Sequence, residues 1–289
     1  MRESQMKKII AAAVAAAFVA PAYAADITIG GEVEFQYVTA TGAQDEANTA
    51  DSVVSVTASD EVDGVSISAT VVMDQDVADN TDGDAASLSL GFGGATLRLG
   101  DTAGGMDSVG DYTDRAPAYG GFGLDGSDHS IALALPSMMG LSITASMSPQ
   151  GGATDGTAED ETGVGVAYSF PNGQVYYGSE EQADGSTHDA VGVRYSMNGI
   201  YVAYEKGNDN DGANDDIAVT GFALTYTMGD LVVGMESQEV KTDGADASTD
   251  DTVVFAEYNM GPVDLYVSQR TADGTAGADG TTVGVEYAF

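Results

Sequence analysis

Charged side chains that interrupt apolar segments are the residues whose type and spacing most clearly indicate chemistry. Arg98 stands between Leu97 and Leu99, and Arg194 stands between Val193 and Tyr195. In an alternating segment, such residues point to the face opposite their apolar neighbours. Charged rings that line a water-filled passage select ions by charge. The competing interpretation is that these residues are wall residues paired across strands.

Further charged residues belong to the same group of candidates. The alternation gives the polar face these additional members: Glu32, Glu34, Glu236, Glu257, Asp264, Arg270 and Glu286. One long connection, residues 101–127, contributes Asp107, Asp111, Asp114 and Arg115. These residues either line the same passage or belong to an acidic, flexible surface loop.

Catalytic and metal-binding motifs have little support. His129 and His188 are the only histidines, which excludes HExxH, and no P-loop or G-x-S-x-G motif occurs. We therefore predict neither enzymatic activity nor a cofactor. Loosely bound divalent cations are a weaker possibility, with Asp209, Asp211 and Asp215 as calcium candidates. The spacing of an EF-hand fails there, which favours a solvated acidic loop.

The elements that position these residues are strands. Apolar and polar residues alternate with period two almost everywhere after residue 25, and Gly, Asp and Asn bound the alternating segments. We count about sixteen segments. They are predicted to begin near Asp26, Ser52, Val65, Ala85, Ala95, Asp128, Leu141, Glu161, Gln174, Thr187, Ile200, Asp216, Leu231, Asp251, Val263 and Thr281.

The connections between these segments alternate between short and long. Short ones such as Gly93-Gly94 and Asn198-Gly199 are typical of hairpin turns. The long ones are rich in Asp and Gly, as in the predicted loops 41–51, 101–127 and 207–215. Successive hairpins place all short turns at one end of the sheet and all long loops at the other. A sheet of this width needs closure to remove its edges, and in a bilayer closure is compulsory.

Amino-acid composition narrows the possible class of protein further. The 289 residues include 46 acidic and 9 basic residues, giving a net charge of −37, and there is no cysteine. This acidity argues against nucleic-acid binding. Residues 1–24 have the basic start, apolar stretch and Ala22-Tyr23-Ala24 cleavage site of a signal peptide, so residues 25–289 form the expected single barrel domain. Removal of the signal leaves six basic and 45 acidic residues.

Aromatic placement favours a membrane barrel over a soluble β-protein. Tyr168, Tyr195 and Tyr226 lie beside short turns on the apolar face, whereas Phe35 and Tyr37 lie towards the long loops. Two such girdles are expected at the two membrane interfaces. We therefore predict an all-β, transmembrane, antiparallel, up-and-down barrel of about sixteen strands.

At both ends, the exported chain resembles the general porins of Gram-negative bacteria. The segment Ala25-Asp26-Ile27-Thr28-Ile29-Gly30-Gly31 resembles their first strand, and the final strand ends in Phe289, a terminal phenylalanine that serves as the assembly signal in such barrels. The resemblance implies short periplasmic turns, long extracellular loops, a homotrimer in the outer membrane, and passive diffusion of ions and small hydrophilic solutes. It also implies that the third long loop, residues 101–127, folds into the barrel, where its acids would oppose Arg98 and Arg194 and create a transverse field. The acidity indicates preference for cations. The alternative function is a secreted or surface-attached acidic β-protein, acting as an adhesin or structural coat.

Overall fold

The computed structural model describes residues 25–41, 45–74, 85–117, 128–149, 160–210, 217–242, 248–273 and 279–289. The predicted signal peptide, residues 1–24, lies outside these residues. Within the described part of the chain, no helix is long and apolar enough to cross a membrane.

Sixteen strands account for most of the described residues. Their bounds are β1 (Asp26–Ala40), β2 (Glu46–Val62), β3 (Val65–Asp74), β4 (Ala85–Phe92), β5 (Ala95–Ala103), β6 (Asp128–Ala134), β7 (Leu141–Ser148), β8 (Glu161–Phe170), β9 (Gly173–Glu181), β10 (Thr187–Met197), β11 (Ile200–Asn210), β12 (Ile217–Met228), β13 (Leu231–Thr242), β14 (Thr249–Asn259), β15 (Val263–Asp273) and β16 (Gly280–Ala288).

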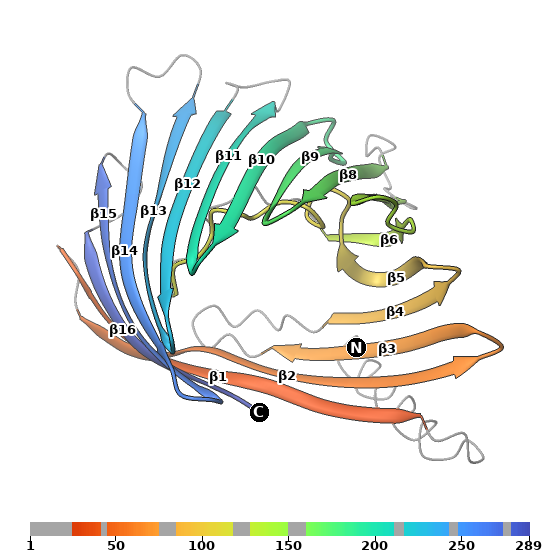
Figure 1. Ribbon diagram of the computed structural model, residues 1–289, viewed down its shortest axis with the longest axis horizontal. Helices are drawn as coiled ribbons and strands as arrows, with labels where there is room; N and C mark the ends of the chain where they lie inside the picture. Colours follow the sequence, from red (N-terminus) through yellow and green to blue (C-terminus); the bar gives the residue numbers. More distant parts are fainter. Residues whose placement is uncertain are drawn as a thin grey trace, which may run out of the picture.

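Each strand pairs antiparallel with its neighbours in sequence, and β1 also pairs with β16, so the sheet closes into a barrel (Figure 1). The closing seam extends to the final residue. The Gly31 N–H donates to the Phe289 carbonyl oxygen at 3.1 Å, and the Phe289 N–H donates to the Gly31 carbonyl oxygen at 2.9 Å. The predicted fold class, an up-and-down antiparallel barrel of sixteen strands, is confirmed.

Side chains alternate between the two faces of the wall. On β10, Val191 and Val193 are exposed on the outer face, whereas Ala190 is buried on the inner face. Outward-facing Tyr168, Tyr195 and Tyr226 are 40–49% exposed and stand near the short turns. The outer face is therefore apolar in the middle of the wall with aromatic residues near its edge, whereas the buried carboxylates of Glu180, Glu205 and Glu236 face inward.

Short turns at one end use residues with positive φ. In the β2–β3 turn, Asp63 has φ 53° and Gly64 has φ 79°. In the β10–β11 turn, Asn198 has φ 52° and Gly199 has φ 82°. Positive φ at both central residues gives a turn whose twist matches that of the paired strands. Asn, Asp and Gly tolerate this conformation better than other residues do, so the local sequence determines these hairpins.

Several strands extend further towards the long loops than alternation predicted. Strand β2 begins at Glu46, six residues before the predicted start at Ser52, so the predicted loop 41–51 is largely strand. Strand β11 likewise continues to Asn210, into the predicted loop 207–215. The strands remain paired where the outer face is no longer apolar, because the hydrogen bonds between them join backbone N–H and C=O groups and do not depend on apolar side chains. A register shift between Glu34 and Phe35 accommodates the extra length of β2.

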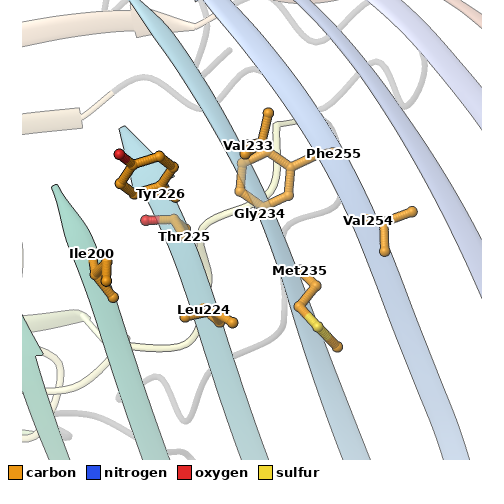
Figure 2. A pocket seen from close by; sticks show the side chains of 9 residues that line it. All are labelled: Ile200, Leu224, Thr225, Tyr226, Val233, Gly234, Met235, Val254 and Phe255. Atoms are coloured by element: carbon orange, nitrogen blue, oxygen red, sulfur yellow. The ribbon is translucent and has the colours of Figure 1, made fainter. Parts of the chain in front are cut away.

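One hollow in the wall between β11 and β14 is shown in Figure 2. Six of its lining residues have the outward parity of their strands: Ile200, Leu224, Tyr226, Val233, Met235 and Val254. This hollow therefore belongs mainly to the outer apolar surface. The polar chemistry of the chain lies on the other side of the wall.

Candidate functional site: a segment held against the inner wall

The chain between β5 and β6 runs inside the ring of strands rather than over its rim. Figure 1 shows this trace passing along the inner side of β8 to β12. Five of its side chains are buried: Met106, Val109, Tyr112, Thr113 and Ala116. We call residues 104–117 the inner segment. Residues 118–127, the rest of the predicted long loop, lie outside the described residues.

Small inward-facing residues make room for the inner segment. Ala167, Ala190, Ala203 and Ala223 are almost completely buried beneath it and form one cluster with its apolar side chains. Glycines bring the segment closer still. A Cβ at Gly178 would lie 2.7 Å from Met106 Cγ, and one at Gly221 would lie 2.5 Å from Thr113 Oγ1. The inner wall of β8 to β12 thus forms a shelf of Gly and Ala on which the segment packs.

Glu205 on β11 is the central polar anchor of the inner segment. Its side chain is fully buried, and its Oε1 accepts hydrogen bonds from the Tyr112 N–H at 2.8 Å and the Tyr176 hydroxyl at 2.5 Å. Its Oε2 accepts from the Thr113 N–H at 2.9 Å and the Thr113 hydroxyl at 2.7 Å. Four donors converge on one carboxylate, which compensates the cost of burying it.

A second carboxylate holds the next part of the segment. Glu236 on β13 is also fully buried, and its Oε2 accepts from the Arg115 N–H at 2.7 Å and the Ala116 N–H at 2.9 Å. At the two ends, the Gly105 N–H donates to Ser146 Oγ at 2.6 Å and the Ser268 hydroxyl donates to the Pro117 carbonyl oxygen at 3.3 Å. The segment is therefore fixed from β7 to β15.

Arginine side chains lie over tyrosine rings where the segment meets the wall. The Arg194 guanidinium carbon lies 4.4 Å from the Tyr112 ring centroid, and that of Arg115 lies 5.0 Å from the Tyr201 ring centroid. The Tyr112 hydroxyl donates to Gln174 Oε1 at 2.6 Å, and the same oxygen accepts from Arg194 Nη2 at 2.7 Å. Burial raises the pKa of Tyr112 to about 12, so its hydroxyl stays a neutral donor at physiological pH.

Acidic side chains dominate the wall that adjoins the end of the segment. A pocket there is lined by Asp114, Arg115, Ala116, Pro117, Glu257, Asp264, Tyr266 and Glu286. Four of these eight residues are carboxylates, from the segment and from β14, β15 and β16. The charges of Glu32, Glu34 and Asp264 act on Glu286, and the Tyr266 hydroxyl donates to Glu34. The space between segment and wall therefore has a strongly negative lining.

The structure brings some of the predicted residues together and separates others. Arg194 touches the inner segment directly, so it does not oppose that segment across the lumen as expected. Arg98 on β5 pairs in register with Ser89 and Ala132, away from Arg194. Arg270 donates to Asp251 at 2.8 and 3.2 Å. Asp107, Asp111 and Asp114 lie on the inner segment, and Asp114 directly precedes Arg115 in the sequence.

The calcium candidates are not assembled among the described residues. Asp209 lies 2.9 Å from Nε2 of His188. Asp211 and Asp215 lie outside the described part of the chain. In the ranges that the structure describes, no three His, Asp or Glu side chains are grouped so as to hold a metal ion.

Sequence reasoning missed the anchoring role of Glu205 and Glu236. Alternation placed Glu236 among the candidate residues of the polar face but gave it no role in holding a segment, and Glu205 was not among the candidates. The available signal was a pair of inward glutamates on alternate strands, β11 and β13, beside small inward residues. A buried glutamate in such surroundings needs hydrogen-bond donors, and a connection folded inward has unpaired N–H groups to supply.

A closed barrel of sixteen strands with a charged inner wall defines the class of β-barrel channels. The model of the Gram-negative porin family matches residues 11–277, and the chain belongs to that family.

Solved porin structures share the fold at low sequence identity. A triple mutant of the Rhodopseudomonas blastica porin aligns with TM-score 0.73 and 19% identity, covering 91% of this chain and all of that one. OmpT of Vibrio cholerae in its trimer form aligns with TM-score 0.73 and 14% identity, covering 92% of this chain and all of that one. No curated protein matches the sequence significantly.

Proposed function

We propose that this outer-membrane porin is a water-filled diffusion channel for ions and small hydrophilic solutes that favours cations. One observation carries the proposal: the inner segment is anchored to one side of the wall, beside a space lined by Asp114, Glu257, Asp264 and Glu286. Fixed charges at such a constriction filter solutes by charge, and the segment limits their size. The mechanism needs no turnover and no bound cofactor.

Electrostatics gives the direction of the selectivity. Acidic residues outnumber basic ones by 46 to 9, so the mouth and the lumen attract cations and repel anions. Arg270 contributes little opposing charge, because Asp251 neutralises it. Arg98 and the exposed Arg115 and Arg194 supply local positive charge on this negative background.

A salt-gradient measurement tests both that the protein forms a channel and that this channel prefers cations. In planar bilayers at about 0.1 M KCl, we expect stable current steps with a cation-selective reversal potential. The preference should weaken towards 1 M, because the Debye length falls from ~10 Å to ~3 Å. The D264N/E286Q double variant should lower the cation-to-anion permeability ratio.

The matched control is E61Q, an exposed acid beside the β2–β3 turn that should leave the ratio unchanged. Well-inserted protein without current steps would contradict the channel. An anion-selective reversal potential would contradict the proposed role of the acidic wall.

We further propose that the outer face contacts lipid, that the protein is exported by the signal peptide, and that it assembles as a homotrimer. The trimer form of OmpT supports the last point by analogy only. Phe289 is proposed as the assembly signal, supported by its two backbone hydrogen bonds to Gly31 at the seam.

Lipid contact predicts a depth-dependent penalty for charge on the outer face. Val254 is half exposed in the middle of β14, and V254R should destabilise the folded protein in bilayers by about 2–4 kcal/mol. Gln269 has outward parity near the loop end of β15, where Q269R should cost only about 0–1 kcal/mol. Urea unfolding in lipid vesicles measures both, and equal penalties would contradict the proposed orientation.

A further inference from the structure

Two arginines lie over tyrosine rings at the inner segment. Arg115 lies over the Tyr201 ring and Arg194 over the Tyr112 ring. The two rings are neighbours, because the Tyr201 hydroxyl donates to the Tyr112 carbonyl oxygen at 2.6 Å. A segment residue and a wall residue thus place two guanidinium groups in one region of the lumen.

The two guanidinium groups differ from that of Arg270 in their partners. Among the described residues, Arg115 and Arg194 form no ion pair, in contrast to Arg270 with Asp251. Both side chains are exposed. Arg194 uses Nη2 for Gln174, which is an uncharged partner. A guanidinium has five N–H donors, so each arginine retains donors for a carboxylate or another oxyanion.

The surrounding charge restricts which ligand reaches this pair. A simple anion is repelled by the acidic chain before it arrives. Arg115, however, lines the same pocket as the carboxylates of Glu257, Asp264 and Glu286. A solute with both a cationic and an anionic group is attracted by the acids and then held by the arginines. The two kinds of charge on the pocket lining therefore match a zwitterion.

We propose that Arg115, Arg194 and the facing carboxylates form a binding site for zwitterionic solutes, such as free amino acids and short peptides. The solute carboxylate binds between the two guanidinium groups, and its ammonium group faces Glu257, Asp264 and Glu286. The proposal rests on the proposed channel function, because the solute reaches the site through the open lumen.

Ion-current block by matched dipeptides tests this site. Dialanine, N-acetyl-dialanine and dialanine amide have similar sizes but are zwitterionic, anionic and cationic, respectively. Each is titrated against the potassium current of wild type, R115Q and R194Q in planar bilayers. We expect dialanine to bind the wild-type channel more tightly than either capped peptide. Each substitution should weaken dialanine about tenfold, the factor expected for one lost charge-assisted hydrogen bond.

Further variants distinguish a specific effect of Arg115 and Arg194 from a general effect of removing positive charge from the lumen. R270Q makes the same charge change at an arginine that Asp251 already pairs, and it should retain tight dialanine block. R194K keeps the positive charge but replaces the planar guanidinium with an ammonium group. It should therefore weaken dialanine block less than R194Q does. R115Q keeps the backbone N–H that bonds Glu236, so it tests the charge with this anchor intact.

Equal block by all three peptides in wild type would overturn the proposal, and so would equal weakening by R270Q and R194Q. Failure of the channel itself has a different signature, because no potassium current would then be present to block.

Discussion

E205A is expected to release the inner segment and to give a wider, noisier channel. The substitution removes the acceptor for the N–H groups of Tyr112 and Thr113 and for two hydroxyls. Each buried N–H left without a partner costs about 1–3 kcal/mol, so the two backbone donors together weaken the docked state by about 2–6 kcal/mol. Single-channel conductance in KCl should rise, and larger neutral sugars should enter vesicles that contain the variant.

Y176F provides a graded control, because it removes only one of the four donors to Glu205. E61Q removes one negative charge at an exposed position beside the β2–β3 turn and should leave the sugar size limit unchanged. If E205A retained wild-type conductance and size limit, the assignment of Glu205 as the anchor would be wrong.

G165V is expected to displace the segment by a steric route. A Cβ at Gly165 would overlap the Gly105 carbonyl oxygen and lie 2.9 Å from the Val109 side chain. Because the nearest atom belongs to the backbone, no side-chain rotation relieves the overlap. Overpacking of this kind costs about 1–3 kcal/mol. Conductance and sugar permeation should therefore change in the same direction as in E205A.

The outward-facing neighbour Val166 supplies the control for G165V. V166I adds volume to the same strand on the opposite face and should not alter the pore. Intact folding of G165V is checked by its resistance to detergent unfolding at room temperature. A folded G165V channel with unchanged conductance would show that the segment does not need the close approach at Gly165.

The strands were predictable because each carries its own period-two pattern and each short turn has its own Gly, Asn or Asp. Most predicted starts, such as those of β3, β5 and β11, coincide with the observed ones. The loop ends of β2 and β11 were not predictable in this way. There the strands stay hydrogen-bonded through polar residues. Backbone hydrogen bonds do not require apolar and polar side chains to alternate, so the sequence pattern does not reveal these strand ends.

The partners of the site residues were less predictable than their faces. Alternation places Arg194 on the inner wall, but its contact with Tyr112 depends on the path of a segment more than 80 residues earlier. The contact between Glu205 and Thr113 has the same origin, with 92 residues between the partners. Such contacts depend on the curvature of the closed barrel and on the Gly and Ala shelf, which no local pattern encodes.

The seam between β1 and β16 has a consequence for the order of folding. All other strand pairs join neighbours in sequence, whereas the seam joins Gly31 to Phe289 across almost the whole described part of the chain. Local hairpins close early, and a contact of such sequence separation has the largest loop-closure cost. Until that contact forms, both terminal strands present unpaired edges that invite association with other chains. The pairing of β1 with β16 thus completes the closed sheet and removes both exposed strand edges.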